Sequence, residues 1–163
     1  MKRAVLLTLM TAVILPFAAR AQAQGKPDFS GAWTLDASKS DAPMGRGGRG
    51  GPAGPVTLAI KQTAAELTIE TKRGEQSQTA VYKLDGSESK NEVAGRGGPS
   101  TVVSKSHWDG AKLVTDGTRE IQGFAITTKE VRSLSADGKE MTVETAISTP
   151  QGDINQKQVF TKS

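Results

Sequence analysis

The chain is 163 residues long and carries 21 Lys or Arg against 17 Asp or Glu, which gives a formal net charge of +4. It contains no cysteine, and this excludes disulfide bonds, thiol catalysis and a lipid attached to an N-terminal cysteine. A chain of this length fits a single domain.

The N-terminal segment has the pattern of a secretory signal peptide. Lys2 and Arg3 precede an apolar run over residues 4–15, and residues 21–23 form an Ala-Gln-Ala cleavage site. The apolar run is too short to cross a bilayer as a helix. We predict that residues 1–23 are a signal peptide and that the mature protein is periplasmic or secreted.

Cleavage after Ala23 leaves residues 24–163, or 163 − 23 = 140 residues, as one domain. Lys2, Arg3 and Arg20 leave with the signal peptide, so the mature charge is 18 − 17 = +1. Such a small charge gives no support for nucleic-acid binding. We therefore expect no nucleic-acid partner, and the sequence leaves the oligomeric state open.

The mature chain has no stretch with apolar residues at helical spacing. Short runs that alternate apolar and polar residues, separated by Gly and Asp, predict strands instead. Ten segments fit this pattern: residues 32–36, 56–62, 66–72, 78–84, 88–93, 101–108, 111–115, 123–135, 140–148 and 153–161. The fifth segment is polar on both faces, so it is either an edge strand or only a loop.

Most connections between these segments contain turn residues. Asp-Gly pairs begin at Asp85, Asp109 and Asp137, and Asp-Gly supplies the positive φ angles of tight turns between antiparallel strands. Closing such a meander into a barrel removes its unpaired edges. We predict an all-β fold, a single up-and-down antiparallel barrel or curled sheet of eight to ten strands.

An outer-membrane barrel would also be exported, and its strands would also alternate apolar and polar residues. It needs strands of about ten residues, an apolar band that faces lipid, and girdles of aromatic residues. The chain has seven aromatic residues, and the loss of Phe17 leaves six, while lysines occur throughout the predicted strands. We expect that the domain does not span a membrane.

Residues 31–33 read Gly-Ala-Trp and match the G-x-W motif that opens the first strand of lipocalins and related calycins. The surrounding residues 27–41 resemble the start of a group of small secreted bacterial proteins. The lipocalin resemblance implies a ligand-carrying barrel with Trp33 as the plug of its base. It also implies a basic side chain over that tryptophan, for which Lys157 and Lys162 are candidates. The usual lipocalin disulfide is absent.

Two stretches rich in glycine and arginine, residues 44–55 and 94–100, interrupt the strand pattern. An RNA-binding RGG segment interleaves aromatic residues, and neither stretch contains one. A phosphate-binding P-loop needs Gly-x-x-x-x-Gly-Lys-Ser/Thr between a strand and a helix, which is also missing. Gly-rich polar segments do not offset the entropy cost of ordering, so we predict two flexible loops.

Four predicted strands lie between these two loops, and each strand of a meander reverses direction, so both loops should lie at the same end. The same count places residues 72–76, 116–123 and 149–153 there. Five of the six mature arginines then share one rim: Arg46, Arg49, Arg73, Arg96 and Arg119. Our hypothesis is that this rim binds an anionic headgroup while an apolar tail enters the barrel.

The sequence shows no pattern of a catalytic or metal site. His107 is the only histidine, whereas zinc takes three or four ligands. Ser104 and Ser106 lie near it, but no Gly-x-Ser-x-Gly motif surrounds them. Two carboxylates can meet across any barrel, yet nothing marks such a pair. We expect no enzyme activity, no metal and no cofactor.

The first function hypothesis is a non-enzymatic carrier or scavenger of a small amphipathic, anionic ligand. The alternative is a module whose loops bind a protein partner or an envelope polymer, as an inhibitor does, and a third is an enzyme that uses the barrel interior. Cavity size separates the first two, because a cavity of ~300 Å³ or more favours a carrier. Six residues could instead fill the interior: Leu58, Ile60, Leu67, Ile69, Val143 and Phe160.

A carrier purified from its own host should retain its ligand. We expect native mass spectrometry to show a non-covalent adduct of lipid-like mass, which is lost when Arg46, Arg49 and Arg96 are replaced by alanine. The measured mass of the protein also tests whether the chain is cleaved after Ala23, as we predict. An empty protein with a filled interior would contradict the carrier hypothesis and favour partner binding.

Overall fold

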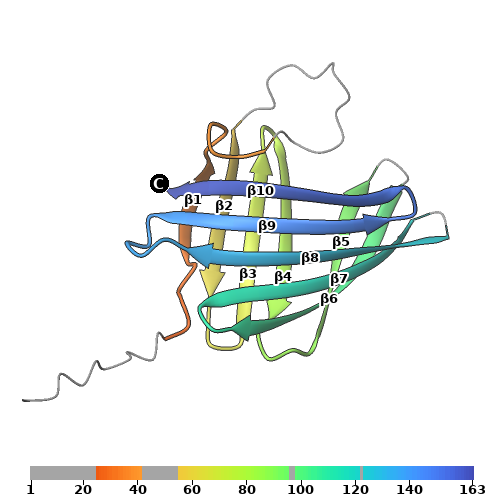
Figure 1. The fold of residues 1–163 in the computed structure, drawn as a ribbon, viewed down its shortest axis with the longest axis horizontal. Helices are drawn as coiled ribbons and strands as arrows, with labels where there is room; N and C mark the ends of the chain where they lie inside the picture. Colours follow the sequence, from red (N-terminus) through yellow and green to blue (C-terminus); the bar gives the residue numbers. More distant parts are fainter. Residues whose placement is uncertain (1–24, 42–54, 96–97, 122) are drawn as a thin grey trace, which may run out of the picture.

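We analysed a computed structural model of the chain, which describes residues 25–41, 55–95, 98–121 and 123–163 (Figure 1). The predicted signal peptide lies outside the described residues. So do Arg46 and Arg49 of the first Gly/Arg loop, and Arg96 of the second.

The described residues form ten strands and no helix. The strands are β1 (Gly31–Leu35), β2 (Val56–Gln62), β3 (Glu66–Arg73), β4 (Gln76–Lys83), β5 (Glu88–Gly95), β6 (Gly98–Asp109), β7 (Lys112–Ile121), β8 (Phe124–Leu134), β9 (Glu140–Thr149) and β10 (Gly152–Lys162). All ten predicted segments are strands, so the all-β prediction is confirmed. The polar fifth segment is β5.

The ten strands make one antiparallel sheet in the order β4-β3-β2-β1-β10-β9-β8-β7-β6-β5. Strands that are neighbours in the chain pair with each other, except β4 and β5, and β1 also pairs with β10, through Trp33 with Lys162 and Leu35 with Phe160. In Figure 1, β1 to β4 run up and down the view and β6 to β10 cross it. The result is a nearly closed up-and-down barrel whose sheet edges are β4 and β5.

Two predicted loops are shorter than expected, because their neighbouring strands continue. The strand predicted over residues 111–115 extends to Ile121 as β7, and Gly117 of the Asp-Gly pair at 116–117 pairs with Thr128 of β8 inside the ladder. Within residues 94–100, Gly95 pairs with Gly98 at the end of the β5–β6 hairpin. Gly98 has a φ of 103°, which glycine tolerates and which closes this hairpin tightly.

One end of the barrel, which we call the closed end, is filled by aromatic side chains. Residues 25–30 cross it, and both Phe29 and Trp33 are 0% exposed. The Phe29 ring stacks on Trp108 with ring centroids 6.1 Å apart, and the Trp33 Nε1 donates a hydrogen bond of 2.9 Å to the Phe29 carbonyl oxygen. Leu67, Leu113 and Met141 complete this packing.

Lys162 lies over Trp33, with its Nζ 5.2 Å from the ring centroid. Gly31 makes this approach possible, because a Cβ at position 31 would lie 2.8 Å from Lys162 Cε. Gly31 also has a φ of 134°, which other residues rarely adopt. The structure therefore gives a steric reason for the glycine that precedes Trp33 by two residues.

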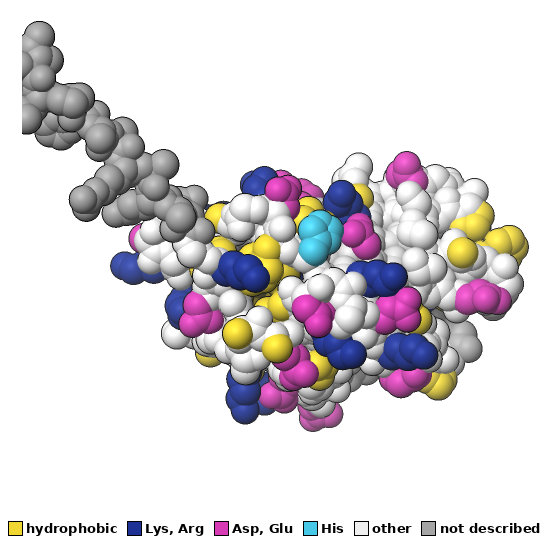
Figure 2. Space-filling model, turned by 90° about the horizontal axis from the view of Figure 1, so that it is seen from below, with side chains coloured by type: hydrophobic (Ala, Val, Ile, Leu, Met, Phe, Trp, Pro, Cys, Tyr) yellow, Lys and Arg dark blue, Asp and Glu magenta, His cyan; other side chains and the backbone are white. Residues whose placement is uncertain are grey.

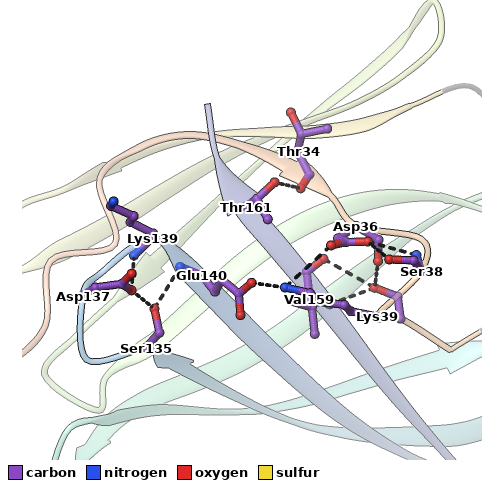
Figure 3. Close-up of polar contacts among 11 residues, drawn as sticks. Thr34, Asp36, Ser38, Lys39, Ser135, Asp137, Lys139, Glu140, Val159 and Thr161 are labelled. Carbon is purple, nitrogen blue, oxygen red and sulfur yellow. Dashed lines mark hydrogen bonds and ion pairs between the residues drawn. The ribbon is translucent and has the colours of Figure 1, made fainter.

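The segment after β1 continues along the edge of β10 with which β1 pairs (Figure 3). The Asp36 amide donates to the Val159 carbonyl at 2.8 Å, and the Asp41 amide donates to the Lys157 carbonyl at 2.8 Å. Lys39 forms an ion pair with Glu140 at the start of β9. These contacts continue the pairing of β1 with β10 beyond the end of β1.

The barrel is closed between β4 and β5 by side chains rather than by a backbone ladder, and we call this line the β4–β5 seam. The Asn91 side chain accepts a hydrogen bond from the Val81 amide at 2.7 Å and donates one to the Val81 carbonyl at 2.9 Å. The Lys83 amide donates to the Ser89 Oγ at 2.8 Å. Asn91 thus takes the place of a neighbouring strand for two backbone groups of β4.

Replacing Asn91 with alanine should leave both Val81 backbone groups without a partner. We expect the free energy of unfolding to fall by roughly 1–3 kcal/mol, measured by urea denaturation, because part-buried polar groups would lose their hydrogen bonds. Hydrogen exchange of the Val81 amide should accelerate. Lys90→Ala is the matched control, since Lys90 is exposed on the same strand. Equal effects of the two substitutions would contradict this account of the seam.

Candidate binding site in the barrel interior

The barrel interior contains a cavity of about 800 Å³ that opens to solvent. The six residues that the sequence offered as a filled core are all buried, yet they leave this space. Leu58, Ile69, Val143 and Phe160 form its apolar wall, and the exposed Gln76 lies at its mouth near the β3–β4 turn. The volume exceeds the ~300 Å³ at which a binding cavity becomes plausible.

A buried arginine lies in the wall of this cavity. Arg132 of β8 is 6% exposed and pairs across the sheet with two buried residues, Leu113 and Val143. Its guanidinium carbon is 5.6 Å from the centre of the Tyr82 ring. Its Nη1 forms an ion pair with the Glu130 Oε1, two residues earlier on the same face of β8.

The partners of Arg132 do not use all of its hydrogen-bonding capacity. Its Nε is buried and has no hydrogen-bond partner among the described residues, and the contact of Nη1 with Glu130 does not have hydrogen-bond geometry. An unsatisfied buried donor costs about 1–3 kcal/mol, and more when it is charged. Arg132 therefore lies in the cavity wall as a buried cation whose Nε donor no described residue pairs.

Tyr82 stands beside this cation and keeps its proton. Burial raises the pKa of the Tyr82 hydroxyl, the nearby Glu130 carboxylate raises it further, and Arg132 opposes both. Because the neutral form is favoured, the hydroxyl remains a hydrogen-bond donor at neutral pH. Tyr82, Glu130 and Arg132 together make a polar cluster in the wall of a partly apolar cavity.

A smaller cavity of about 230 Å³ adjoins the first, since both are lined by Tyr82, Arg119 and Glu130. Hydroxyl-bearing residues dominate its remaining wall, which comprises Val102, Ser104, Thr115, Gly117, Thr118 and Thr128. Ser104 is 3% exposed, and its Oγ has no hydrogen-bond partner among the described residues. The interior thus combines a larger cavity of mixed polarity with a smaller one that several Ser and Thr residues line but whose accessible surface is mainly apolar.

The structure brings two of the five predicted rim arginines together. Arg73 at the end of β3 and Arg119 of β7 line the same cavity. Arg119 lies within a strand, which corrects its placement in a connecting loop, and the continuation of the β7–β8 ladder is the reason. Arg46, Arg49 and Arg96 lie outside the described residues, so the five-arginine rim stays a prediction.

Sequence reasoning missed the polar cluster. Arg132 is the one mature arginine that the rim hypothesis leaves out, and it is buried. The alternation along β8 gave little signal, because Arg132 and Glu130 share a face with the partly buried Ile126 and Leu134, while the other face also mixes charged and apolar residues. A charged pair on the inward face of a strand indicates a functional or an ion-paired interior.

The other candidates do not form sites. His107 is exposed, and the surrounding face in Figure 2 mixes basic and acidic side chains without a patch of one sign. Within the described residues, no group of three or more His, Asp or Glu side chains is placed to hold a metal ion. Among the same residues there is also no helix of sufficient length and apolarity to cross a membrane.

The fold resembles that of solved binding and transport proteins. The chain aligns with REP1-NXSQ fatty acid transporter at 15% identity and a TM-score of 0.59, over 82% of this chain and 95% of the other. A variant of the fluorescent protein UnaG aligns at 19% identity and a TM-score of 0.55, over 83% and 96%. The fatty acid-binding protein of Drosophila melanogaster brain tissue aligns at 20% and 0.55, over 82% and 99%.

At these identities the likeness shows the fold alone: this chain forms an up-and-down antiparallel barrel like those of the similar structures. No protein-family model matches the sequence, and no curated protein matches it either.

Tyr82 is the only tyrosine of the chain, so its titration can be followed by tyrosinate absorbance without interference from another. We expect its pKa to lie above the ordinary value of 10.0, because burial and Glu130 disfavour the anion. The folded state then holds this proton more tightly than the unfolded state, so stability should fall as the pH rises through the range above 10.0.

Glu130→Gln should lower the pKa of Tyr82, because it removes the second of the two causes that raise it. Glu144→Gln is the control, since Glu144 is exposed on the outer face of β9. A midpoint at or below the ordinary value in the wild-type protein would show that the Tyr82 hydroxyl is solvated and outside the cluster.

Proposed function

We propose that the protein is a non-enzymatic carrier that holds a small amphipathic molecule with an anionic headgroup inside its barrel. The observation that carries this proposal is the buried Arg132 in the wall of a cavity of about 800 Å³. A filled interior would have favoured the alternative of a loop-mediated partner-binding module, and the interior is not filled.

The cavity wall matches both parts of such a ligand. Leu58, Ile69, Val143 and Phe160 offer an apolar surface for a tail, and burial of a tail contributes about 25 cal/mol per Å² removed from water. Arg132 and Tyr82 offer hydrogen-bond donors for the anion, and hydrogen bonds to charged groups contribute about 1.5–3 kcal/mol each. A ligand that satisfies Arg132 also relieves the cost of its unpaired Nε.

The arginines nearer the mouth have a different role in this proposal. Arg73 is exposed and Arg119 is partly buried, so they attract an anion toward the cavity before it reaches Arg132. Arg46, Arg49 and Arg96 belong to the same proposal through their position in the sequence. Charges near the mouth act mainly on the association rate and are screened by salt.

The structural comparisons support a carrier, since the similar proteins include a fatty acid transporter and a fatty acid-binding protein. The N-terminal segment supports a periplasmic or secreted location, where such a protein would collect or deliver its ligand outside the cytoplasm. We expect the exported protein to start at residue 24. Its measured mass tests this location, because it shows whether the predicted signal peptide has been removed.

A matched pair of ligands tests the role of the interior cation. We expect dodecanoate to displace the neutral dye Nile red from the wild-type protein at a concentration about tenfold or more below that needed for dodecanol, because only the carboxylate pairs with Arg132. The double variant Arg132→Met with Glu130→Gln should bind the two ligands about equally. Both residues are changed together because Arg132→Met alone would leave Glu130 as an unpaired charge beside the ligand.

Two results would contradict the proposal. One is failure of the wild-type protein to bind any of the three molecules. The other is an unchanged preference for dodecanoate in the double variant, with its far-ultraviolet circular dichroism like that of the wild type. The variant Arg73→Gln serves as a control at the exposed mouth, where we expect a small, salt-dependent effect on the association rate.

A further inference from the structure

The interior cation does not stand alone, because an acid lies beside it. Glu130 contacts Arg132 through its Oε1 and lines both the larger and the smaller cavity. Its side chain is 24% exposed, so it is largely shielded from bulk water. A ligand that reaches Arg132 therefore also meets a carboxylate.

A plain fatty acid fits this environment poorly. Its carboxylate would have to approach Arg132 next to the like-charged Glu130, and two carboxylates that share a site repel each other. Glu130 can accept more hydrogen bonds than its contact with Arg132 uses, because an ionised carboxylate accepts about four. The natural complement of Glu130 is a hydrogen-bond donor on the ligand.

The smaller cavity offers room for such a donor. It measures about 230 Å³ and is lined by Glu130, Arg119, Ser104 and Thr128. The Ser104 Oγ is buried without a hydrogen-bond partner among the described residues. Gly117 contributes no side chain there, and a Cβ at that position would contact Val102 at 3.5 Å and Ser104 at 3.9 Å. A hydroxyl group fits here, since it both donates and accepts hydrogen bonds.

The charges of the interior favour a hydroxyl over an ammonium group. Three cations line these cavities, Arg73, Arg119 and Arg132, and two anions, Glu92 and Glu130, so the set carries a net charge of 3 − 2 = +1. A headgroup with a single net negative charge would balance this set, whereas a zwitterion would leave one positive charge uncompensated. We therefore expect the ligand to have an uncharged hydrogen-bond donor close to its carboxylate.

We infer that the ligand class is the hydroxylated fatty acid, with its hydroxyl within two or three carbons of the carboxylate. The carboxylate binds Arg132 and Arg119, the hydroxyl donates to Glu130 and accepts from Ser104 Oγ, and the alkyl chain extends into the larger cavity. Glu130 is then the residue that determines specificity. This inference rests on the proposed carrier function, and it names the ligand class for the same site.

The experiment compares three acids of equal chain length: dodecanoate, 2-hydroxydodecanoate and 3-hydroxydodecanoate. Dissociation constants are measured by displacement of Nile red from the full mature protein. We expect at least one of the hydroxy acids to bind roughly tenfold more tightly than dodecanoate, because a site built to bond a hydroxyl discriminates against the analogue without one.

Variants assign the preference to its cause. Glu130→Gln should reduce the difference in dissociation constant between dodecanoate and the hydroxy acids. The main change should be tighter binding of dodecanoate, because the repulsion between the two carboxylates is gone. Ser104→Ala should weaken the hydroxy acid several-fold and leave dodecanoate unchanged. Glu144→Gln removes the same charge from the exposed outer face and should change neither. If Glu130→Gln fails to fold, the wild-type comparison and Ser104→Ala still decide the question.

The outcomes separate the two proposals. Binding of dodecanoate at least as tight as that of both hydroxy acids would overturn the inference and leave the carrier function in place. A preference for a hydroxy acid that survives both Glu130→Gln and Ser104→Ala would also overturn it. Failure of all three acids to displace the dye, together with failure of dodecanol, would overturn the carrier function itself.

Discussion

The pairing of β1 with β10 is the contact on which the rest of the structure depends. Every other backbone ladder joins strands that are neighbours in the chain, whereas this one joins the two ends of the domain and converts a meander into a barrel. Closure gives each strand an inner and an outer face and places residues from β2, β4, β8 and β9 around one cavity. Without it, Arg132 would lie on an open sheet and would be hydrated.

The ion pair between Glu130 and Arg132 stabilises the fold less than well-packed apolar side chains would. Replacing a buried ion pair with apolar residues of similar volume is often neutral or stabilising, so Glu130 and Arg132 are poor candidates for stabilising elements. The unpaired Arg132 Nε and Ser104 Oγ add to that cost. A domain that keeps these groups inside while its other end is packed with apolar side chains is better explained by binding than by stability.

Much of the fold could be predicted from the sequence, and the centre of the site could not. Asp-Gly turns and period-two alternation identified all ten strands, because both signals are local. For β8 the inner and outer faces are harder to tell apart from the sequence. Lys129 and Val131 lie on one face, Glu130 and Arg132 lie on the other, and each face mixes charged and apolar residues. Only pairing with Leu113 and Val143 on the neighbouring strands determines that Arg132 faces inward. The count of strand directions predicts Arg73 and Arg119 at one end of the barrel, and both residues line the larger cavity.

The cavity itself follows from where the few large side chains lie. Of the six aromatic residues outside the predicted signal peptide, Phe29, Trp33 and Trp108 pack at the closed end, and Phe124 is 56% exposed. Several inward positions of β6, β7 and β8 carry short side chains, namely Ser104, Thr115 and Thr128, or none, at Gly117. A barrel of fixed circumference with small residues at these positions cannot fill its interior. Larger residues there would fill the smaller cavity first, so the same substitutions that improved packing would remove the space that we propose for a polar headgroup.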